Sequence, residues 1–218
     1  MESKDSLVFD TLGTTIPQSE IKKLRAILWA NAAKYGVSEE EVKQLQQYCQ
    51  MAKDSEEFRT YARRTGPLFA QLVYDGETDI VLYDDVRPAF ELARNLDHAL
   101  RILSKGTTEL SIAIYDTNGL LHVIGRDNIH STTVELEHKA KTDPACYLEF
   151  QERVLTPAGE RFRSYTSDDP AEVNACREAF GINDADVWFI DRGQEGKDKL
   201  ASGTKVSKSL YEIVKNYE

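Results

Sequence analysis

Four polar residues of this 218-residue chain stand where side chains could do chemistry. Asp10, Ser104 and Asp168 each come at or just after the end of a predicted strand, and Lys141 stands just before a predicted helix. In open parallel sheets, ligands bind outside the carboxyl ends of the strands. If these strands are parallel, we therefore expect the four side chains to converge on one edge of the sheet.

The residue types of this set suit phosphoryl transfer. An aspartate such as Asp10 can act as a nucleophile and form an acyl-phosphate. Two carboxylates with a carbonyl and waters make a Mg2+ site, because this ion is usually held by one or two carboxylates and keeps several waters. The Ser104 hydroxyl and the Lys141 ammonium can hold phosphate oxygens and offset the charge of the transition state.

The elements that must position these residues alternate along most of the chain. Alternation of strands and helices predicts an α/β fold, with a parallel sheet and helices on both faces. The predicted strands are 7–10, 99–103, 121–124, 161–166 and 187–190. The helices predicted between and after them are 84–95, 107–117, 143–154, 170–180 and 209–217.

Residues 16–80 interrupt this alternation after the first strand. Apolar residues at helical spacing, together with capping residues, predict helices over 21–35, 38–53 and 55–66 and a further apolar segment over 68–74. The third of these helices is expected to end near Gly66 and Pro67, because proline cannot supply the hydrogen bond that a helix interior needs. The layout predicts one α/β core with a helical insertion.

Composition limits the partners and the compartment. The formal net charge is −10 and no basic cluster stands against it, so we expect no nucleic-acid partner. No apolar run approaches the ~18 residues of a membrane span, and the polar amino terminus predicts no signal peptide. Three cysteines without CxxC spacing predict reduced thiols, which favours a cytoplasmic protein.

The segments that carry the polar residues, taken in this order, resemble the motifs of the haloacid dehalogenase (HAD)-like hydrolase superfamily. Residues 9–14 resemble its nucleophile loop, and residues 102–107 resemble its second motif. Residues 141–144 are similar to its Lys-Pro-Asp-Pro third motif. Residues 165–177 resemble its acidic loop with the helix after it, and residues 187–193 the strand and turn that usually follow.

The resemblance implies a fold and a division into domains. The fold is a Rossmannoid core with a parallel sheet and helices on both faces, plus an inserted α-helical cap. The core is expected to comprise residues 1–15 and 81–218, and the cap residues 16–80. The cap in this family is mobile and closes over the site, and it determines which small-molecule substrate is bound.

The resemblance also implies a role for each polar residue. Asp10 is expected to be the nucleophile, while Ser104 and Lys141 bind the transferring group. The residues expected to contribute to substrate binding are Thr14, Lys105 and Gly106. The ligands expected for Mg2+ are Asp10, Asp168 and the backbone carbonyl of Leu12, with Asp169 or Glu172 as a supporting acid. Lys139 is a nearby alternative to Lys141.

Leu12 departs from the pattern of the family's phosphatases. At that position they have a second aspartate, which protonates the leaving alcohol and then activates water. Leucine does neither, and loss of a positioned acid or base typically costs ~10²–10⁴ in rate. The sequence therefore predicts a Mg2+-dependent phosphohydrolase that is slow or restricted to good leaving groups such as acyl phosphates.

Two alternatives stay open. The dehalogenase branch also has a non-acidic residue at the position of Leu12, and it attacks carbon without a metal. That branch lacks the acid that corresponds to Asp168, and it usually has an asparagine where Lys105 stands. The other alternative is a protein that keeps the fold but acts by binding, with little or no catalysis.

Three arginines in the predicted cap could take part in substrate choice. Arg25, Arg63 and Arg64, together with Trp29, are candidates to face the site. An arginine fork suits carboxylate or phosphate. A solvated helix face is the alternative interpretation of each.

Overall fold

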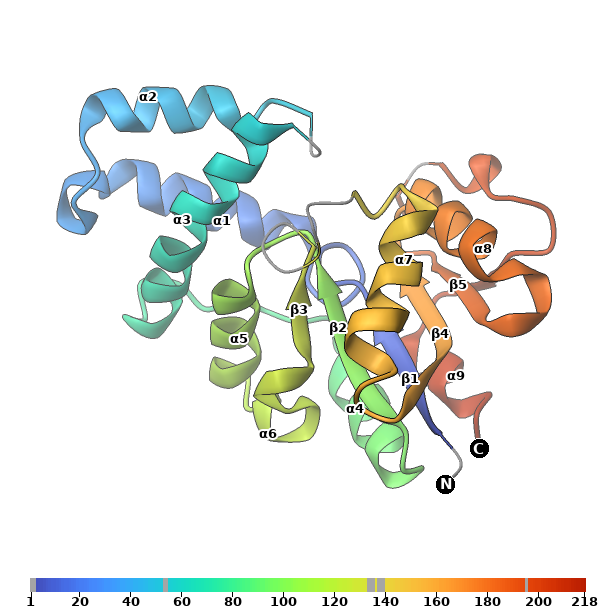
Figure 1. Ribbon diagram of the computed structural model, residues 1–218. Coiled ribbons are helices and arrows are strands. Elements are labelled where there is room, and N and C mark those ends of the chain that lie inside the picture. Colours follow the sequence, from blue (N-terminus) through green and yellow to red (C-terminus); the bar gives the residue numbers. More distant parts are fainter. Residues whose placement is uncertain (1–2, 53–54, 133–135, 137–139, 195) are drawn as a thin grey trace.

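A six-stranded sheet forms the centre of the computed structural model, which describes residues 3–52, 55–132, 136, 140–194 and 196–218 (Figure 1). Every pairing is parallel, in the order β3-β2-β1-β4-β5-β6. The strands are β1 (Lys4–Phe9), β2 (Ala99–Ser104), β3 (Ile129–Ser131), β4 (Glu160–Ser167), β5 (Asp186–Ile190) and β6 (Lys205–Ser207). The predicted parallel sheet is confirmed, and β1 lies inside it between β2 and β4.

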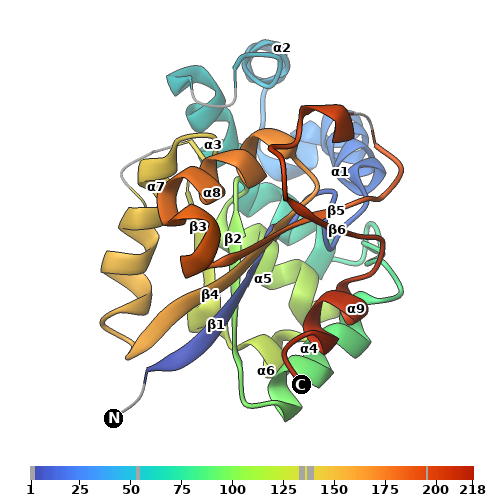
Figure 2. The same cartoon turned by 90° about the vertical axis from the view of Figure 1, so that its right-hand side faces the viewer.

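Helices cover both faces of the sheet (Figure 2). On one face lie α7 (Pro144–Phe150) and α8 (Pro170–Asp184). On the other lie α4 (Val86–Asn95), α5 (Thr108–Thr117), α6 (Leu121–Ile124) and α9 (Leu210–Lys215). Because successive side chains of a strand point to opposite faces, Val8 packs toward α7 and α8, while Leu7 and Phe9 pack toward α4 and α9. The predicted helices on both faces are confirmed.

Three helices stand to one side of the sheet and follow β1 in the chain (Figure 1). They are α1 (Gln18–Ala30), α2 (Glu39–Tyr48) and α3 (Glu56–Tyr74), with a short 3-10 helix over Ala32–Tyr35. Their apolar side chains form a second buried cluster, which continues onto α5 through Leu110, Ala113 and Ile114. Within the described part of residues 16–80 all regular structure is helical.

The predicted end of a helix at Gly66 and Pro67 is wrong, because α3 continues through both residues to Tyr74. A proline inside a helix removes one hydrogen bond and its ring crowds the preceding turn, at a total cost of about 3 kcal/mol, and burial on either side offsets this cost. Phe58 and Tyr61 before the proline, and Phe69 after it, are buried on the same helix. A Cβ on Gly66 would lie only 2.1 Å from the Thr107 hydroxyl oxygen, so glycine lets α3 approach α5 closely.

The strand predicted over 121–124 is also wrong. These residues form the one-turn helix α6, because Leu120 and Ile124 are four residues apart and both are buried on one side of that turn. The third strand of the sheet is instead β3, in which Ile129 is the single apolar residue. The edge strand β6 was not predicted either, since it offers only Val206 as an apolar signal.

Other differences are confined to the ends of elements. The helix predicted to reach 53 ends at Tyr48, and the helix predicted over 143–154 is regular only to Phe150 before a π-helical turn over Gln151–Leu155. At Gly181 the backbone leaves the helical region, where the sequence predicted the stop of that helix. None of the helices within the described residues combines the length and apolar character needed to cross a membrane.

Candidate active site

Three of the four chemically interesting residues meet where neighbouring strands end. Asp10 follows β1, Ser104 ends β2 and Asp168 follows β4, and β1 pairs with both of the other strands. The three residues are almost completely buried, with 5%, 4% and 6% exposure. The parallel register therefore brings these polar groups together at one edge, in an environment largely shielded from water.

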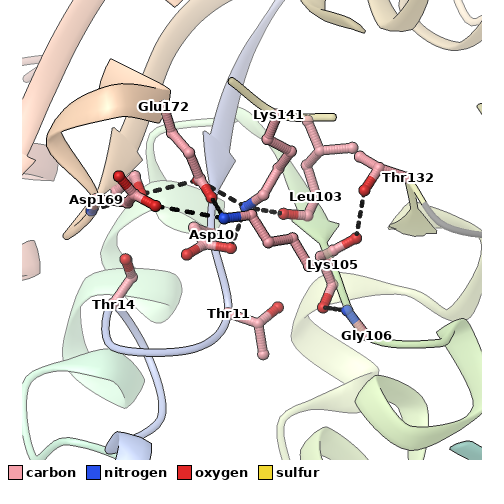
Figure 3. A network of polar contacts seen from close by, with 12 residues as sticks. Asp10, Thr11, Thr14, Leu103, Lys105, Gly106, Thr132, Lys141, Asp169 and Glu172 are labelled. Carbon is pink, nitrogen blue, oxygen red and sulfur yellow. Dashed lines mark hydrogen bonds and ion pairs between the residues drawn. The ribbon is translucent and has the colours of Figure 1, made fainter. Parts of the chain in front are cut away.

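Lys141 joins this group from the segment before α7. Its ammonium contacts the Asp10 carboxylate, donates to the Leu103 carbonyl at 3.1 Å, and lies 2.9 Å from the Glu172 carboxylate (Figure 3). The side chain is fully buried. Four contacts, including one to the Tyr165 hydroxyl at 3.2 Å, hold the ammonium in place. Lys139, the alternative lysine, lies outside the described residues.

Glu172 is the acid around which the cations are arranged. Its carboxylate accepts hydrogen bonds from the Tyr165 hydroxyl at 2.6 Å and the Ser167 hydroxyl at 3.0 Å, and it lies 2.5 Å from the Lys105 ammonium. Burial alone would raise the pKa of Glu172, but the Lys141 and Lys105 ammonium groups outweigh it and lower the pKa to about 2. Glu172 is therefore ionised, and its carboxylate oxygens are occupied by hydrogen bonds and ion pairs within the protein.

Asp10 and Asp168 have the opposite electrostatics. Burial raises the pKa of Asp10 to about 7, and the Glu172 and Asp168 charges add to this against the opposing effect of Lys141. Burial, and then the Glu172 charge, raise the pKa of Asp168 to about 6. Both carboxylates resist ionisation because they are buried and near other negative charges. A divalent cation bound between them would reduce this repulsion and favour their ionised forms.

The loop after β1 is shaped around Asp168. The Thr14 hydroxyl accepts a hydrogen bond from the Asp168 backbone N–H at 3.1 Å and donates to its carboxylate at 3.3 Å. Gly13 has a φ of +83°, and a Cβ there would lie 2.0 Å from an Asp168 carboxylate oxygen. Gln18 donates to the other carboxylate oxygen at 3.4 Å. Glycine at position 13 is needed for both the turn and the close approach.

Arg192, which the sequence did not single out, holds the same loop from the end of β5. Its guanidinium donates to the Asp85 carboxylate at 2.8 and 3.1 Å and to the Thr14 carbonyl at 3.0 Å. Gln194 donates to the Asp168 carbonyl at 3.1 Å. The position of Arg192 just after a strand was the one signal in the sequence, since the residues that Arg192 contacts come from distant parts of the chain.

The donor set predicted from the sequence for a cation comprises the Asp10 and Asp168 carboxylates and the Leu12 carbonyl. The Leu12 carbonyl accepts no hydrogen bond from the described residues, so this oxygen is available. Of the two candidate supporting acids, Glu172 is bound to lysines, and Asp169 caps α8 by accepting from the Ala171 N–H at 2.9 Å. Among the described residues no three His, Cys, Asp or Glu side chains cluster as a metal site.

A cavity of about 380 Å³ opens onto Asp10 and Asp168. Of the predicted substrate-binding residues, Lys105 and Gly106 line it, as does Ser104, whose hydroxyl oxygen accepts from the Gly106 N–H at 3.0 Å. Its remaining walls come from the loop after β1, from α1, α3 and α5, and from the start of α8. Thr14 and Lys141 do not line the cavity: Thr14 contacts Asp168, and Lys141 lies behind Asp10.

One of the candidate cap arginines lines the cavity. Arg25 does so from α1, whereas Arg63 and Arg64 are paired with Glu56 at 3.2 Å and Glu41 at 2.5 Å. Trp29 is not part of the cavity wall.

Neither protein-family models nor curated proteins match the sequence. Solved structures do match it over nearly the whole chain. A HAD phosphatase from Thermococcus onnurineus is similar with a TM-score of 0.67 and 19% identity, covering 97% of both chains. CbbY from Rhodobacter sphaeroides in complex with phosphate is similar with a TM-score of 0.62 and 17% identity, covering 96% of both chains. A dehalogenase is similar with a TM-score of 0.57 and 17% identity, covering 98% of this chain and 96% of that one.

These structures include a phosphatase and a dehalogenase, so they agree on the architecture and differ in the chemistry that their names state. The resemblance inferred from the motifs is thus confirmed at the level of architecture. The chain has the fold of the haloacid dehalogenase-like hydrolases.

Proposed function

We propose that the protein is a HAD-like hydrolase that acts as a Mg2+-dependent phosphohydrolase on a small phosphorylated molecule. The observation that carries this proposal is that the buried residues Asp10 and Asp168 line one cavity together with Lys105, and that the Asp168 charge raises the pKa of Asp10. Carboxylates and ammonium groups together suit a cation and a phosphoryl group. A carbon-attacking enzyme would not need Asp168.

Asp10 is the nucleophile in this proposal. Lys141 contacts one of its carboxylate oxygens, and the other accepts no hydrogen bond from the described residues. That free oxygen attacks phosphorus, the bond from phosphorus to the leaving oxygen breaks, and the leaving group departs with the electron pair. Water then attacks the phosphorus of the aspartyl phosphate. Phosphate and a proton are released, and Asp10 is regenerated.

The cationic side chains stabilise charge during both displacements. The Lys105 ammonium and the Ser104 hydroxyl face the cavity, where they can bind the equatorial phosphate oxygens. Lys141 contacts the Asp10 carboxylate, orients it and favours its ionised form against the effect of burial. Mg2+, held by Asp10, Asp168 and the Leu12 carbonyl, would neutralise phosphoryl charge and permit both carboxylates to ionise together.

Leu12 limits the substrates that this site can use. This residue is 38% exposed and lines the cavity together with Asp10, so position 12 supplies no acid to protonate a leaving alcohol. We infer that the leaving group must depart unprotonated, as a carboxylate does from an acyl phosphate. The same residue favours the second candidate, a binding protein of this fold with little or no turnover.

The domain division fits this chemistry. We propose residues 1–15 and 81–218 as the core that carries the reacting groups, and residues 16–80 as a cap that covers them. The cavity wall supports this, because residues of α1 and α3 line the same cavity as Ser104 and Asp168.

The test is a substrate panel with Asp10→Asn as the blank. Phosphate monoesters, acyl phosphates and haloacids are incubated with Mg2+ or with a chelator. The proposal predicts release of phosphate from acyl phosphates that stops on chelation and is absent in Asp10→Asn. Halide release that continues in the presence of the chelator would support a carbon hydrolase instead. No product release from any substrate would support the binding protein.

A further inference from the structure

We propose that Arg25 binds a second anionic group of the substrate, a carboxylate or a phosphate, remote from the reacting phosphoryl group. This inference rests on the phosphohydrolase proposed above and names the substrate class: small dianionic or polyanionic molecules with a short apolar body between the two charged ends. Three observations support it: the course of the cavity, its apolar middle, and the unsatisfied charge of Arg25.

The cavity follows one face of α1 away from the reacting groups. Gln18 at the start of α1 contacts Asp168, and Ile21 and Arg25 follow at helical spacing along the same wall. With a rise of 1.5 Å per residue, Arg25 lies about 10 Å further along the helix axis than Gln18. A substrate whose phosphoryl group reaches Asp10 therefore presents its far end to Arg25.

The middle of the cavity is apolar. The facing helix α3 contributes Phe58, Tyr61, Thr65 and Phe69, which recur at helical spacing and so share one face. These four side chains carry no charge, and their two hydroxyls are already engaged: Tyr61 accepts from Arg25, and Thr65 donates to the Tyr61 carbonyl. An aliphatic or aromatic linker is the chemistry that fits this wall.

Arg25 is fixed in orientation, but none of the acids in the described part of the chain neutralises it. Its Nε donates to the Tyr61 hydroxyl at 2.8 Å, and its guanidinium lies 5.5 Å from the centre of the Tyr61 ring. No carboxylate of the described residues lies within ion-pair distance of it. Its terminal Nη groups thus keep their donors for a ligand, in the fork that binds carboxylate or phosphate through two hydrogen bonds.

Two other arginines of the same helical region form ion pairs with glutamates, in contrast to Arg25. Arg63 and Arg64 on α3 are both paired with glutamates. The chain as a whole carries ten more acidic than basic side chains, 37 against 27. A half-buried guanidinium that pairs with none of the described acids, in the wall of a cavity that also contains Asp10, marks an anion subsite. Lys22, which also lines the cavity, adds positive charge beside it.

The experiment compares three acyl phosphates with leaving benzoates of similar acidity: 4-ethylbenzoyl phosphate, 4-(2-carboxyethyl)benzoyl phosphate and 4-(2-phosphonooxyethyl)benzoyl phosphate. In the wild-type protein we expect kcat/KM to be at least about tenfold higher for the substrates with an anionic tail, the gain from a charged hydrogen bond. Preference between the two anionic tails tells carboxylate from phosphate.

Arg25→Gln should reduce the ratio of kcat/KM between substrates with and without an anionic tail to about one, mainly through KM. Arg25→Lys should keep part of this preference. Arg63→Gln, which removes an arginine outside the cavity, should leave the ratio unchanged. A wild-type ratio of one, or a ratio that persists in Arg25→Gln, would overturn the inference and leave Arg25 as a packing partner of Tyr61. Should Arg25→Gln not fold, Arg25→Lys carries the comparison.

The two proposals can fail separately. If none of the acyl phosphates is hydrolysed, the phosphohydrolase proposal fails, and calorimetric binding of 4-ethylbenzylphosphonate and 4-(2-carboxyethyl)benzylphosphonate then decides on the subsite. Tighter binding of the carboxylate compound, lost in Arg25→Gln, supports it. Equal binding of both compounds refutes it.

Discussion

The Glu172 carboxylate lies 2.9 Å from the Lys141 ammonium, and neither side chain is more than 1% exposed. A second ammonium, from Lys105, lies 2.5 Å from the same carboxylate. Charges removed from water in this way are costly unless they are paired, and removal of one partner leaves the others uncompensated. Glu172 therefore stabilises the ammonium groups of both Lys141 and Lys105.

Glu172→Gln should destabilise the protein by about 3–5 kcal/mol, because it leaves two ammonium groups near each other without their shared acid. Urea unfolding measures this. The folded-state pKa of about 2 lies below the ordinary 4.5, so this stabilisation is present above pH 4.5 and is lost as the pH falls toward 2.

Asp169→Asn is the matched control for that substitution. Asp169 also pairs with Lys105, at 3.3 Å, but its side chain is 39% exposed, and asparagine can replace it as a helix cap. We expect a loss below about 1 kcal/mol. An equal loss in both variants would contradict the central place given to Glu172.

Mg2+ affinity should fall steeply in acid. The pKa values of about 7 for Asp10 and about 6 for Asp168 mean that both ligands are protonated at low pH, and a proton must leave before a cation binds. Between about pH 8 and about pH 5, calorimetry should show at least about a 100-fold weaker affinity, with proton release on binding. An isotherm that does not change with pH would refute the assigned ligands.

Without metal, the protein should be more stable in acid than at neutral pH, whereas its Mg2+ affinity should be lower in acid. A carboxyl group with a raised folded pKa stabilises the fold below its ordinary pKa, and that contribution is lost as the pH rises from about 4 through 7. Asp168→Asn, which cannot ionise, should remove part of this loss. The comparison is made by urea unfolding with a chelator present, near pH 5 and near pH 8.

Leu12→Asp should restore an acid beside the leaving group. The position is 38% exposed, so the change in stability should stay within about 0.5 kcal/mol. Turnover of an alkyl phosphate should rise by about 10²-fold, and turnover of p-nitrophenyl phosphate, with its better leaving group, should rise less. A uniform change for both substrates would show that the missing acid does not limit the reaction.

Gly13→Ala should damage the site more than the fold. It adds strain at a φ of +83° and places a Cβ 2.0 Å from an Asp168 carboxylate oxygen. Gly76→Ala is a control with similar strain, since Gly76 has a φ of +68° and nothing within 4 Å of the added Cβ. Both variants should lose about 1 kcal/mol of stability. Mg2+ affinity should fall in Gly13→Ala alone, and equal affinities would contradict the close approach of this loop to Asp168.

The sequence predicted the central strands because their burial requires an apolar run. Val8 and its neighbours in β1 face helices on both sides, and this leaves a readable signal. The edge strands gave none: β3 has only Ile129 and β6 only Val206 as apolar residues. Continuation of α3 through Pro67 was hidden as well, since it depends on burial against α5, which local propensity does not report.

The site was predictable where chemistry coincides with a strand end, as at Asp10, Ser104 and Asp168. The contacts between these positions were not predictable from spacing. Glu172 contacts two lysines from separate segments, and Arg192 reaches Thr14 across 178 positions of the chain. Such contacts follow from strand order, which the sequence did not specify.

The reaction that we propose depends on attack of the Asp10 carboxylate on phosphorus. The most direct test mixes excess acetyl phosphate with the protein and Mg2+, quenches the reaction in acid within its first turnovers, and analyses the peptide that contains Asp10 by mass spectrometry. We expect a phosphoryl group on Asp10, absent in Asp10→Asn and absent when Mg2+ is chelated. Release of phosphate at the wild-type rate from Asp10→Asn, or phosphate found on another residue, would contradict it.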